Sequence, residues 1–420
     1  MAKPVDRKNH KDYQEQLRKA KEKGRRGKDL PKRWRARYRR PDGSQTSQDF
    51  HRQQEAQDFL DDLAVNKKKG IFYDPQDAKT LIEEGAEEWL NSQLHLEEST
   101  RVLYRGALDN HILPKWGKTQ YGAVTHADGS AWYQAIYNPD LNQQDPEDDD
   151  DEDPVPIKTT GVGASYLHTI HRVFHQILDW GVMGMKIPFN PAARISLPRK
   201  PPSKHIYLNH QQIDLLANEV ANYPYRKKAA RAMADAWRVL ILVLAYTGLR
   251  WGEATAIRVG RVDLDRRRIY IEEAVKQGNG KPYFGLPKTH EQRAVSIPRF
   301  LVREIETLTA GKSARDLLFT SAEGGILRAP NFRNRVFLPI VRKLAAEGLI
   351  PKGMTPHKLR HTAASIAIAA RADVKVVQNM LGHKTASMTL DRYGHLFPDR
   401  LDEVADAMEE HRQHELAKAA

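Results

Sequence analysis

Arginine and histidine side chains occur in several short motifs at the ends of predicted helices in the second half of this 420-residue chain. Arg250 lies three residues before Glu253 at a glycine turn that follows an apolar helix, so both side chains share one face of a helical turn. His357 and Arg360 have the same spacing at the start of a later helix. Guanidinium groups bind anionic oxygens through paired hydrogen bonds. The pattern therefore indicates a site for an anionic substrate such as a phosphodiester.

Two more residues extend this pattern towards the C-terminus. His383 follows a short helix in Leu381-Gly382-His383, and Tyr393 comes ten residues later. A tyrosine hydroxyl, with an ordinary pKa of about 10, needs cationic neighbours before it becomes a nucleophile. Attack on a phosphodiester builds charge on its non-bridging oxygens, which Arg250 and Arg360 could neutralise. Each residue alone would fit packing or surface charge, and only their combination in this order is informative. Glu253 would support Arg250 or His357 rather than react.

Other chemistries lack their motifs. Gly311-Lys312-Ser313 imitates the end of a phosphate-binding loop, but Glu306 stands where the first glycine belongs. His357 and His361 have the spacing of zinc ligands, yet Lys358 replaces the glutamate of that motif. Cysteine is absent, and no Gly-x-Ser-x-Gly elbow occurs. We therefore expect no metal site, no ATP site, no hydrolytic serine and no cofactor.

Helices and short strands after residue 205 must position the candidate side chains. An apolar helix over 230–247 ends at the glycine turn before Arg250. Period-two alternation predicts strands near 268–273 and 294–298, with a turn region over 278–288 between them. Further helices are predicted at 209–221, 300–310, 331–346, 357–371, 373–381 and 384–391. After Tyr393, a charged helix over 399–417 carries a stripe of Leu401, Val404 and Met408.

The net charge of +13 is concentrated at the N-terminus. The first 40 residues hold 17 Lys and Arg against 5 Asp and Glu, which is +12 and leaves +1 for the rest. Such a block is typical of a partly disordered arm that binds a polyanion, and nucleic acid is the favoured partner. A solvated tail that only aids solubility is the alternative.

A small module follows the start of this arm. A basic strand is predicted from four arginines that alternate with apolar residues: Arg33, Arg35, Arg37 and Arg39. A turn over 41–44, a return strand over 45–50 and an amphipathic helix complete a sheet-plus-helix unit. A row of guanidiniums on one face of the strand suits a reader of the DNA backbone or groove.

The middle of the chain is predicted to be helical. Residues 79–200 contain three helical patterns, the second broken at Pro114. Residues 145–153 hold eight carboxylates and no cation, which predicts a disordered insertion. Residues 194–204, with three prolines and four cations, predict a linker. No apolar stretch approaches the ~20 residues of a membrane span, and no secretory signal follows the start.

Read in order, the candidate residues strongly resemble the signature of the tyrosine recombinases, the phage-type integrase family. The matching stretches are TGLRWGE (247–253), PKTHEQRAVSIP (287–298), TPHKLRHTAAS (355–365), LGHKTASMTL (381–390) and DRYGHL (391–396). They cover the catalytic region, about 205–400. Residues 79–200 look like the core-binding domain of this family, and residues 29–74 are similar to its arm-type-site domains.

The resemblance implies a role for each catalytic residue. Tyr393 would attack the scissile phosphate, form a 3′-phosphotyrosyl bond and release a 5′-hydroxyl. Lys288 would be the acid for the leaving 5′ oxygen, although Lys276 and Lys281 lie in the same hairpin region. His357 would assist as general base, and His383 would donate to the phosphoryl oxygens.

The resemblance also implies a multidomain fold and its boundaries. A basic arm and small β-sheet-plus-helix domain would occupy 1–74. An all-α core-binding domain over 75–193 would carry the acidic insertion near 140–158. The linker 194–204 would lead to an α+β, mostly α, catalytic domain over 205–420, including the tail helix.

The expected partners are double-stranded DNA attachment sites, with the chain acting as a homotetramer in the cytoplasm of a bacterial host and without a membrane. An excision factor and a host DNA-bending protein are open additions, and the tail helix would dock on its own domain or on a neighbouring protomer. Two rival functions remain. One is a catalytically inactive DNA-binding regulator on the same scaffold, and the other is a type IB-like topoisomerase.

Overall fold

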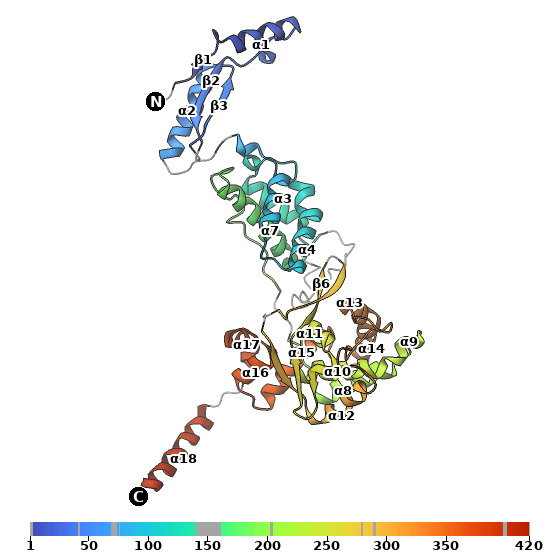
Figure 1. The fold of residues 1–420 in the computed structure, drawn as a ribbon. Coiled ribbons are helices and arrows are strands. Elements are labelled where there is room, and N and C mark those ends of the chain that lie inside the picture. The colour runs from blue at the N-terminus through green and yellow to red at the C-terminus, as the bar shows by residue number, and fades with distance from the viewer. Residues whose placement is uncertain are drawn as a thin grey trace. The chain divides into compact units, whose positions relative to one another are not determined.

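The chain forms two compact units, as the computed structural model in Figure 1 shows. It describes residues 3–40, 43–68, 74, 76–138, 140, 161–201, 205–278, 280–288, 291–397 and 401–419. Described residues up to Lys200 belong to one unit and those from Pro201 onward to the other. The acidic run 145–153 lies outside the described residues. The prediction of a multidomain, mostly helical chain with small sheets is confirmed, whereas the division of the first unit near residue 74 stays a prediction.

A three-stranded antiparallel sheet begins the first unit. Its strands β1 (Val5–Asp6), β2 (Trp34–Arg39) and β3 (Gln45–Phe50) lie in the order β1-β2-β3. Trp34, Ala36 and Tyr38 share one face of β2 because side chains alternate along a strand. Helix α2 (Gln53–Lys68) covers that face, burying Ala36 against Ala56 and Leu60. The arginines of β2 therefore occupy the opposite face, as the alternation predicts.

The N-terminal arm is more ordered than its composition suggests. Residues predicted as low-complexity arm form β1, helix α1 (Lys11–Glu22) and a short 3₁₀ turn, η1 (Gly27–Asp29). Arg7 is buried and its guanidinium binds Asp12 at 2.6 Å and Asp49 of β3 at 2.5 Å. Tyr13 and Ala20 are the buried residues of α1. Two buried positions in a lysine-rich helix make too faint a stripe to be recognised from the sequence.

The rest of the first unit is a helical bundle. Its elements are η2 (Asp77–Lys79), α3 (Ile82–Ser92), α4 (Glu98–Ala107), the π-helical turn η3 (Leu108–Ile112), α5 (Leu113–Trp116), η4 (Tyr121–Ala123), α6 (His126–Ile136) and α7 (Ala164–Met183). The predicted break at Pro114 is wrong because α4, η3 and α5 follow one another without a gap, and the π-helical turn η3 lies directly before the turn that holds this proline. Helix α6 was not predicted because a glycine is one of its three buried positions, Gly129, Trp132 and Tyr133, which leaves only two large apolar side chains to mark the helical spacing.

The second unit contains the helices and strands of the candidate site. Its helices are α8 (His210–Asn222), α9 (Lys228–Ala232), α10 (Ala234–Thr247), α11 (Trp251–Ala256), α12 (Arg299–Thr309), α13 (Ala329–Phe332), α14 (Leu338–Ala346), α15 (Pro356–Ala369), α16 (Val374–Leu381), α17 (Ala386–Tyr393) and α18 (Leu401–Ala419), with the turns η7 (Val259–Arg261), η8 (Arg333–Phe337) and η9 (Gly394–Leu396). Its strands are β4 (Val262–Asp263), β5 (Arg268–Ile271), β6 (Ala274–Gly278), β7 (Lys281–Gly285) and β8 (Arg293–Ser296).

These strands form two small antiparallel sheets. One has the order β4-β5-β8, and the other is the hairpin β6-β7, in which Ala274 pairs with Gly285. The turn region predicted over 278–288 is thus largely strand β7. Strand β7 was not predicted because Pro282 and two flanking glycines are typical of turns.

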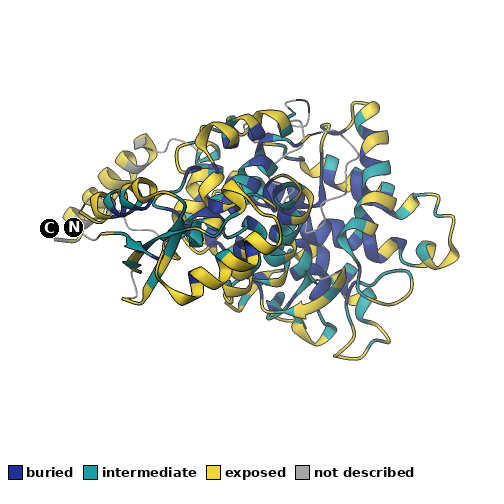
Figure 2. Ribbon diagram, turned by 90° about the horizontal axis from the view of Figure 1, so that it is seen from above, coloured by how far each residue is buried: buried dark blue, intermediate teal, exposed yellow. Residues whose placement is uncertain are grey.

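Helix α10 is the centre of the second unit. Every residue from Val239 to Ala245 is at most 2% exposed, which fits a helix that is apolar all round. It packs against α8, α12 and α15. Figure 2 shows the opposite pattern for the outer helices, where buried and exposed faces alternate along one ribbon. Burying α10 fixes both of its ends, so the turn that follows it is held in place.

Helix α18 is charged and its described side chains are exposed, with Met408 at 67%. The side chains of Leu401 and Val404, which complete the predicted stripe, lie outside the described residues. Docking of this helix on a neighbouring protomer stays a prediction. Within the described part of the chain, no helix has both the length and the apolar character needed to cross a membrane.

Candidate active site

Helix α15 supplies the first group of side chains. Thr355 precedes it as the N-cap and Pro356 occupies its first turn, where a fixed φ favours the helix. His357, Arg360 and His361 follow with the spacing of one helical face, and all three are buried. A helix start carrying three buried polar residues needs polar partners, which the neighbouring elements provide.

A glycine turn brings Arg250 to this helix. Helix α10 ends at Gly248, whose φ of 67° is left-handed and whose missing Cβ leaves room for Leu381. The carbonyl of Gly248 accepts a hydrogen bond from Arg360 Nη1 at 2.6 Å. Arg250, two residues beyond this turn, leads into α11. The two predicted arginines are therefore joined through one turn of backbone.

Glu253 holds Arg250 in place. Its carboxylate is 1% exposed and accepts from the Arg250 backbone N–H and from Arg250 Nη1, both at 3.0 Å. It also accepts two hydrogen bonds from Arg293, at 3.0 Å from Nη1 and 2.6 Å from Nη2. Burial opposes its charge, but the neighbouring arginines lower the pKa of Glu253 to about 2. Glu253 is thus an anion that orients two guanidiniums, as expected for a supporting residue.

Arg293 is a member of this site that the sequence analysis missed. It lies on β8 on the same side as the buried Val295, and its side chain is 12% exposed. A Cβ on Gly382 would lie 2.7 Å from the Arg293 Cζ, so the backbone of the turn before His383 packs directly against this guanidinium. An arginine facing inward beside a core valine was a signal that strand alternation could have provided.

Tyr393 is fully buried at the end of α17. Its hydroxyl lies 2.5 Å from Nδ1 of His361, which is 4% exposed. The two rings come from helices α15 and α17 and have centroids 5.7 Å apart. The sequence analysis treated His361 only as a rejected zinc ligand. His357, the predicted base, packs edge-on against His361 with centroids 5.0 Å apart.

His383 lies beside Tyr393 and is uncharged at neutral pH. Its ring is parallel to the Tyr393 ring within 6°, at 6.4 Å between centroids. Its Nδ1 is 2.9 Å from Oγ1 of the buried Thr389. Burial, followed by the charges of Arg360 and Arg250, lowers the pKa of His383 to about 3. This histidine can therefore act as a neutral hydrogen-bond donor.

Arg360 is the most buried cation of the site. Burial first, and the nearby Arg250 second, lower its pKa to about 9, while Glu253 and Tyr393 act in the opposite direction. Arg360 is therefore still protonated at neutral pH. Burying a charge in this way is costly unless anions compensate it. The site is thus a cationic region that an incoming phosphate would stabilise.

Lys288 differs from the other predicted residues. Its side chain is exposed in the connection between β7 and β8, as is that of Lys281 on β7, while Lys276 on β6 is half-buried. The structure thus brings together Arg250, Glu253, His357, Arg360, His383 and Tyr393, and adds Arg293 and His361. Lys288 remains on the surface, on the strand connection that leads into Arg293.

Two of the four arginines predicted as a basic row, Arg33 just before β2 and Arg35 on it, are neutralised by carboxylates of the same sheet. Arg33 binds Asp6 at 2.6 Å, and Arg35 binds Asp49 at 2.7 Å. Arg37 and Arg39 are exposed, and no ion pair joins them to another described side chain. The four arginines are therefore not equivalent.

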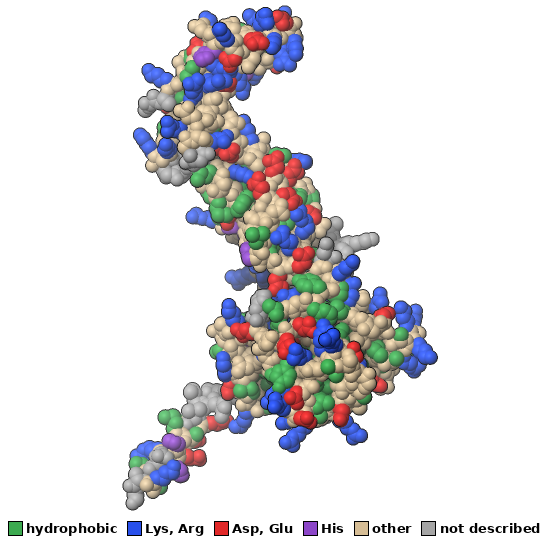
Figure 3. All heavy atoms as spheres, viewed as in Figure 1, with side chains coloured by type: hydrophobic (Ala, Val, Ile, Leu, Met, Phe, Trp, Pro, Cys, Tyr) green, Lys and Arg blue, Asp and Glu red, His purple; other side chains and the backbone are tan. Residues whose placement is uncertain are grey.

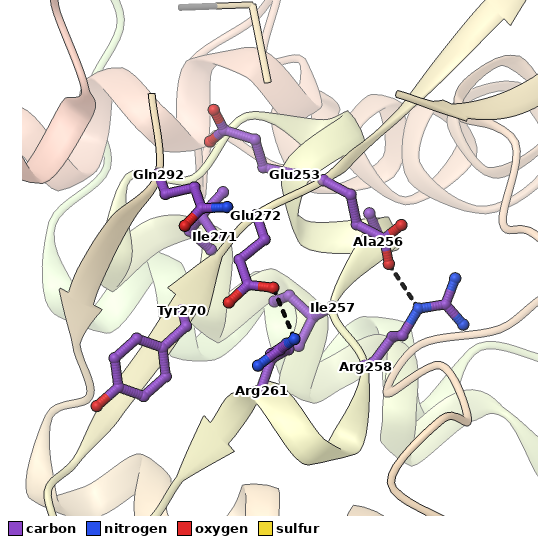
Figure 4. Close-up of a pocket in the computed structure, with 10 residues that line it drawn as sticks. Glu253, Ala256, Ile257, Arg258, Arg261, Tyr270, Ile271, Glu272 and Gln292 are labelled. Carbon is purple, nitrogen blue, oxygen red and sulfur yellow. Dashed lines mark hydrogen bonds and ion pairs between the residues drawn. The ribbon is translucent and has the colours of Figure 1, made fainter. Parts of the chain in front are cut away.

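A cavity of about 360 Å³ lies behind Glu253. Figure 4 shows its charged walls, in which Arg258 binds Glu273 at 2.5 Å and Arg261 binds Glu272 at 2.8 Å. Glu253 is its one lining residue from the predicted site. Separately, no group of three or more His, Cys, Asp or Glu side chains in the described residues could hold a metal ion.

A buried tyrosine beside two arginines and two histidines, on a mostly helical domain, is the arrangement that the resemblance to the tyrosine recombinases predicts. The chain matches the model of the phage integrase family over residues 207–400. It is 26% identical over 387 residues to a protein of Mycobacterium tuberculosis described as a prophage phiRv2 integrase, covering 89% of this chain and 91% of that one.

One more relative and one solved structure of similar fold widen the comparison. Tyrosine recombinase XerC of Bifidobacterium longum is 31% identical over 182 residues, which are 42% of this chain and 48% of that protein. The solved structure of the Tn1549 transposon integrase with a circular intermediate DNA has a TM-score of 0.61 at 16% identity, covering 79% of this chain and all of that one. The shared fold thus extends beyond the catalytic region.

Proposed function

We propose that this chain is a site-specific DNA recombinase that cuts and rejoins DNA strands through a 3′-phosphotyrosyl bond to Tyr393. One observation carries the proposal, namely the buried Tyr393 hydroxyl bonded to His361 on the helix that also holds Arg360. If Tyr393 only filled space in the core, it would not need a hydroxyl group next to cationic side chains. The match to the family model and the prophage integrase among its relatives support the same function.

The arginines, His383 and Lys288 each have a task in this reaction. Arg250 and Arg360 bind the non-bridging oxygens, and their attraction grows as negative charge develops in the transition state. His383 can donate from Nε2 if Thr389 donates its hydroxyl proton to Nδ1, which fixes the tautomer. Lys288, on its exposed strand connection, would reach the leaving 5′ oxygen as the acid.

The reaction needs no external energy source in this scheme. Tyr393 attacks phosphorus, the 3′-phosphotyrosyl bond forms, and the bond to the 5′ oxygen breaks. The 5′-hydroxyl of a partner strand then attacks the same phosphorus and releases Tyr393. Because one phosphodiester is exchanged for another through an ester of similar energy, strand joining is the reverse of cleavage.

The biological setting follows from the relatives. We infer integration, and excision, of a phage or other mobile element, with homotetramers acting on paired attachment sites in the cytoplasm of a bacterial host. A prophage integrase is among the relatives, and a transposon integrase bound to a circular intermediate is a solved structure of similar fold. An excision factor and a host DNA-bending protein would be partners that set the direction of the reaction.

The decisive experiment traps the covalent intermediate. A nicked duplex made from the joined ends of the mobile element releases a short strand after cleavage, which prevents rejoining. We expect the wild-type chain to become covalently bound to DNA in the presence of EDTA, and peptide mapping to place the bond on Tyr393. Binding without a covalent product would support the inactive regulator, and relaxation of plasmids without recombinant product would support the topoisomerase.

The arginines of strand β2 lead to a second prediction, which concerns DNA binding. Figure 3 shows many lysine and arginine side chains on the N-terminal part of the chain. Arg37 and Arg39 on β2 are exposed and form no ion pair with another described side chain. We expect the double variant Arg37→Ala/Arg39→Ala to bind duplex DNA more weakly at every sequence. The slope of log affinity against log salt should fall by about 0.9 for each lost phosphate contact. Fluorescence anisotropy over a salt series measures this slope.

Arg35 provides the matched control for that experiment. Its guanidinium is bound to Asp49 across the sheet, so Arg35→Gln should leave the salt slope unchanged. It should instead lower the free energy of unfolding by about 1 kcal/mol. An equal loss of slope in the Arg35 variant would show that the ion pair opens on DNA and that all four arginines act alike.

A further inference from the structure

The contact between Tyr393 and His361 has a chemical consequence beyond positioning. The Oη–Nδ1 distance of 2.5 Å puts one proton between two buried heavy atoms. His361 is fixed on α15, which packs against the central helix α10, while Tyr393 ends α17. A proton transferred along this bond would need no rearrangement of either helix.

The other polar groups around the hydroxyl are poor proton acceptors. Arg360 on α15 and Arg250 before α11 carry guanidiniums, which have no lone pair to offer. His383, after α16, already has Nδ1 at 2.9 Å from Thr389, and its lowered pKa marks a weak base. His357 packs against the His361 ring, with centroids 5.0 Å apart, whereas a distance of 2.5 Å joins the Tyr393 hydroxyl to Nδ1 of His361. Among these groups, the imidazole of His361 has both the geometry and the lone pair.

We propose that His361, rather than His357, accepts the proton of Tyr393 during strand cleavage. This inference rests on the proposed recombinase function. As the Tyr393 Oη–H bond breaks, its proton passes to Nδ1 of His361 and the oxygen lone pair forms the bond to phosphorus. The bond from phosphorus to the 5′ oxygen breaks with its electron pair on oxygen, which takes a proton from the acid, Lys288. In the joining step the imidazolium of His361 returns its proton to Oη.

The proposal requires one tautomer, which can be measured without DNA. Nδ1 of His361 must carry the lone pair and Nε2 the proton. We expect ¹⁵N NMR of the full-length free chain to show that the histidine whose ring resonances shift in Tyr393→Phe has an unprotonated Nδ1. His210 and Tyr246 form a matched surface pair, at 2.7 Å, so Tyr246→Phe should shift a different histidine. A proton on Nδ1 of His361 would make it a donor to Tyr393 and would overturn the proposal.

A conservative variant separates proton transfer from holding the tyrosine. In His361→Asn the amide oxygen can still accept from the hydroxyl near the position of Nδ1, but it cannot take up a proton. We expect single-turnover cleavage of the nicked duplex to slow ~10²–10⁴-fold, with DNA affinity within about twofold of wild type. The fall in rate at low pH that reports protonation of His361 should also disappear. His210→Asn, outside the site, should keep the wild-type rate and pH profile.

The outcomes distinguish this proposal from the proposed function. Failure of the wild-type chain to cleave would sink the recombinase function itself, whereas the NMR tautomer would still report the hydrogen bond. A wild-type rate in His361→Asn, with the wild-type chain active, would show that His361 only holds Tyr393. A faster rate in His361→Ala than in wild type would show that the contact restrains the nucleophile. Either result would overturn the role of His361 as acceptor.

Discussion

Tyr393→Phe should abolish covalent trapping of DNA while leaving DNA binding within about twofold of wild type. The ring fills a buried position among Ala364, Ile368, Val377 and Leu381, and phenylalanine preserves that packing. Only the oxygen that would bond to phosphorus is lost. Leaving Nδ1 of His361 without its hydroxyl partner should lower the free energy of unfolding by about 1 kcal/mol. Denaturing gel electrophoresis of the nicked-duplex reaction, together with anisotropy for binding, measures both effects.

A second tyrosine tests whether this loss belongs to the position. Tyr246 also has its hydroxyl bonded to a histidine, His210, but at the surface. Tyr246→Phe should therefore cleave and trap DNA as wild type does. Residual cleavage in Tyr393→Phe, at any rate above the uncatalysed one, would mean that another group is the nucleophile. Loss of binding in the same variant would instead point to a folding defect.

The residue types of the site could be predicted from the sequence, but the contacts between them could not. Arg250, Glu253, Arg360 and Tyr393 were found because their local motifs are short and their spacing is helical. Arg293 and His361 were within the same motifs, yet their roles depend on a strand meeting a turn and on two helices meeting. The spacing of residues along one helix or strand does not predict such contacts between different elements.

The fold shows the same division between local and non-local information. The strong apolar period of α7 and the alternation of β2 were recognised because each segment buries one whole face. Helix α1 was missed because it buries only Tyr13 and Ala20. The buried Arg7 that binds Asp12 of this helix also binds Asp49, a residue far along the chain. A helix break was predicted at Pro114 because proline usually ends a helix, but the chain stays helical through this residue by way of the π-helical turn η3.

Glu253→Gln should be the most destabilising single change in the site. The carboxylate satisfies two guanidiniums at once, and glutamine keeps its shape while removing its charge. Arg250 and Arg293 would then be poorly compensated in a buried site, which we expect to lower the free energy of unfolding by about 3 kcal/mol. Cleavage should slow ~10²-fold because Arg250 loses the anion that orients it towards phosphate. Denaturant titration and single-turnover cleavage measure the two losses.

The pH dependence of stability provides an independent check on the charge of Glu253. Its pKa is lowered from 4.5 to about 2 in the folded chain, so its contribution is complete above 4.5 and is lost as pH falls towards 2. The difference in unfolding free energy between wild type and Glu253→Gln should therefore shrink over that interval. Adding Arg293→Met to Glu253→Gln should restore part of the stability, because the uncompensated guanidinium is removed. If the single variant unfolds at the wild-type denaturant concentration, or if the double variant is less stable by the full sum of both changes, the carboxylate does not hold the two arginines together as the geometry requires.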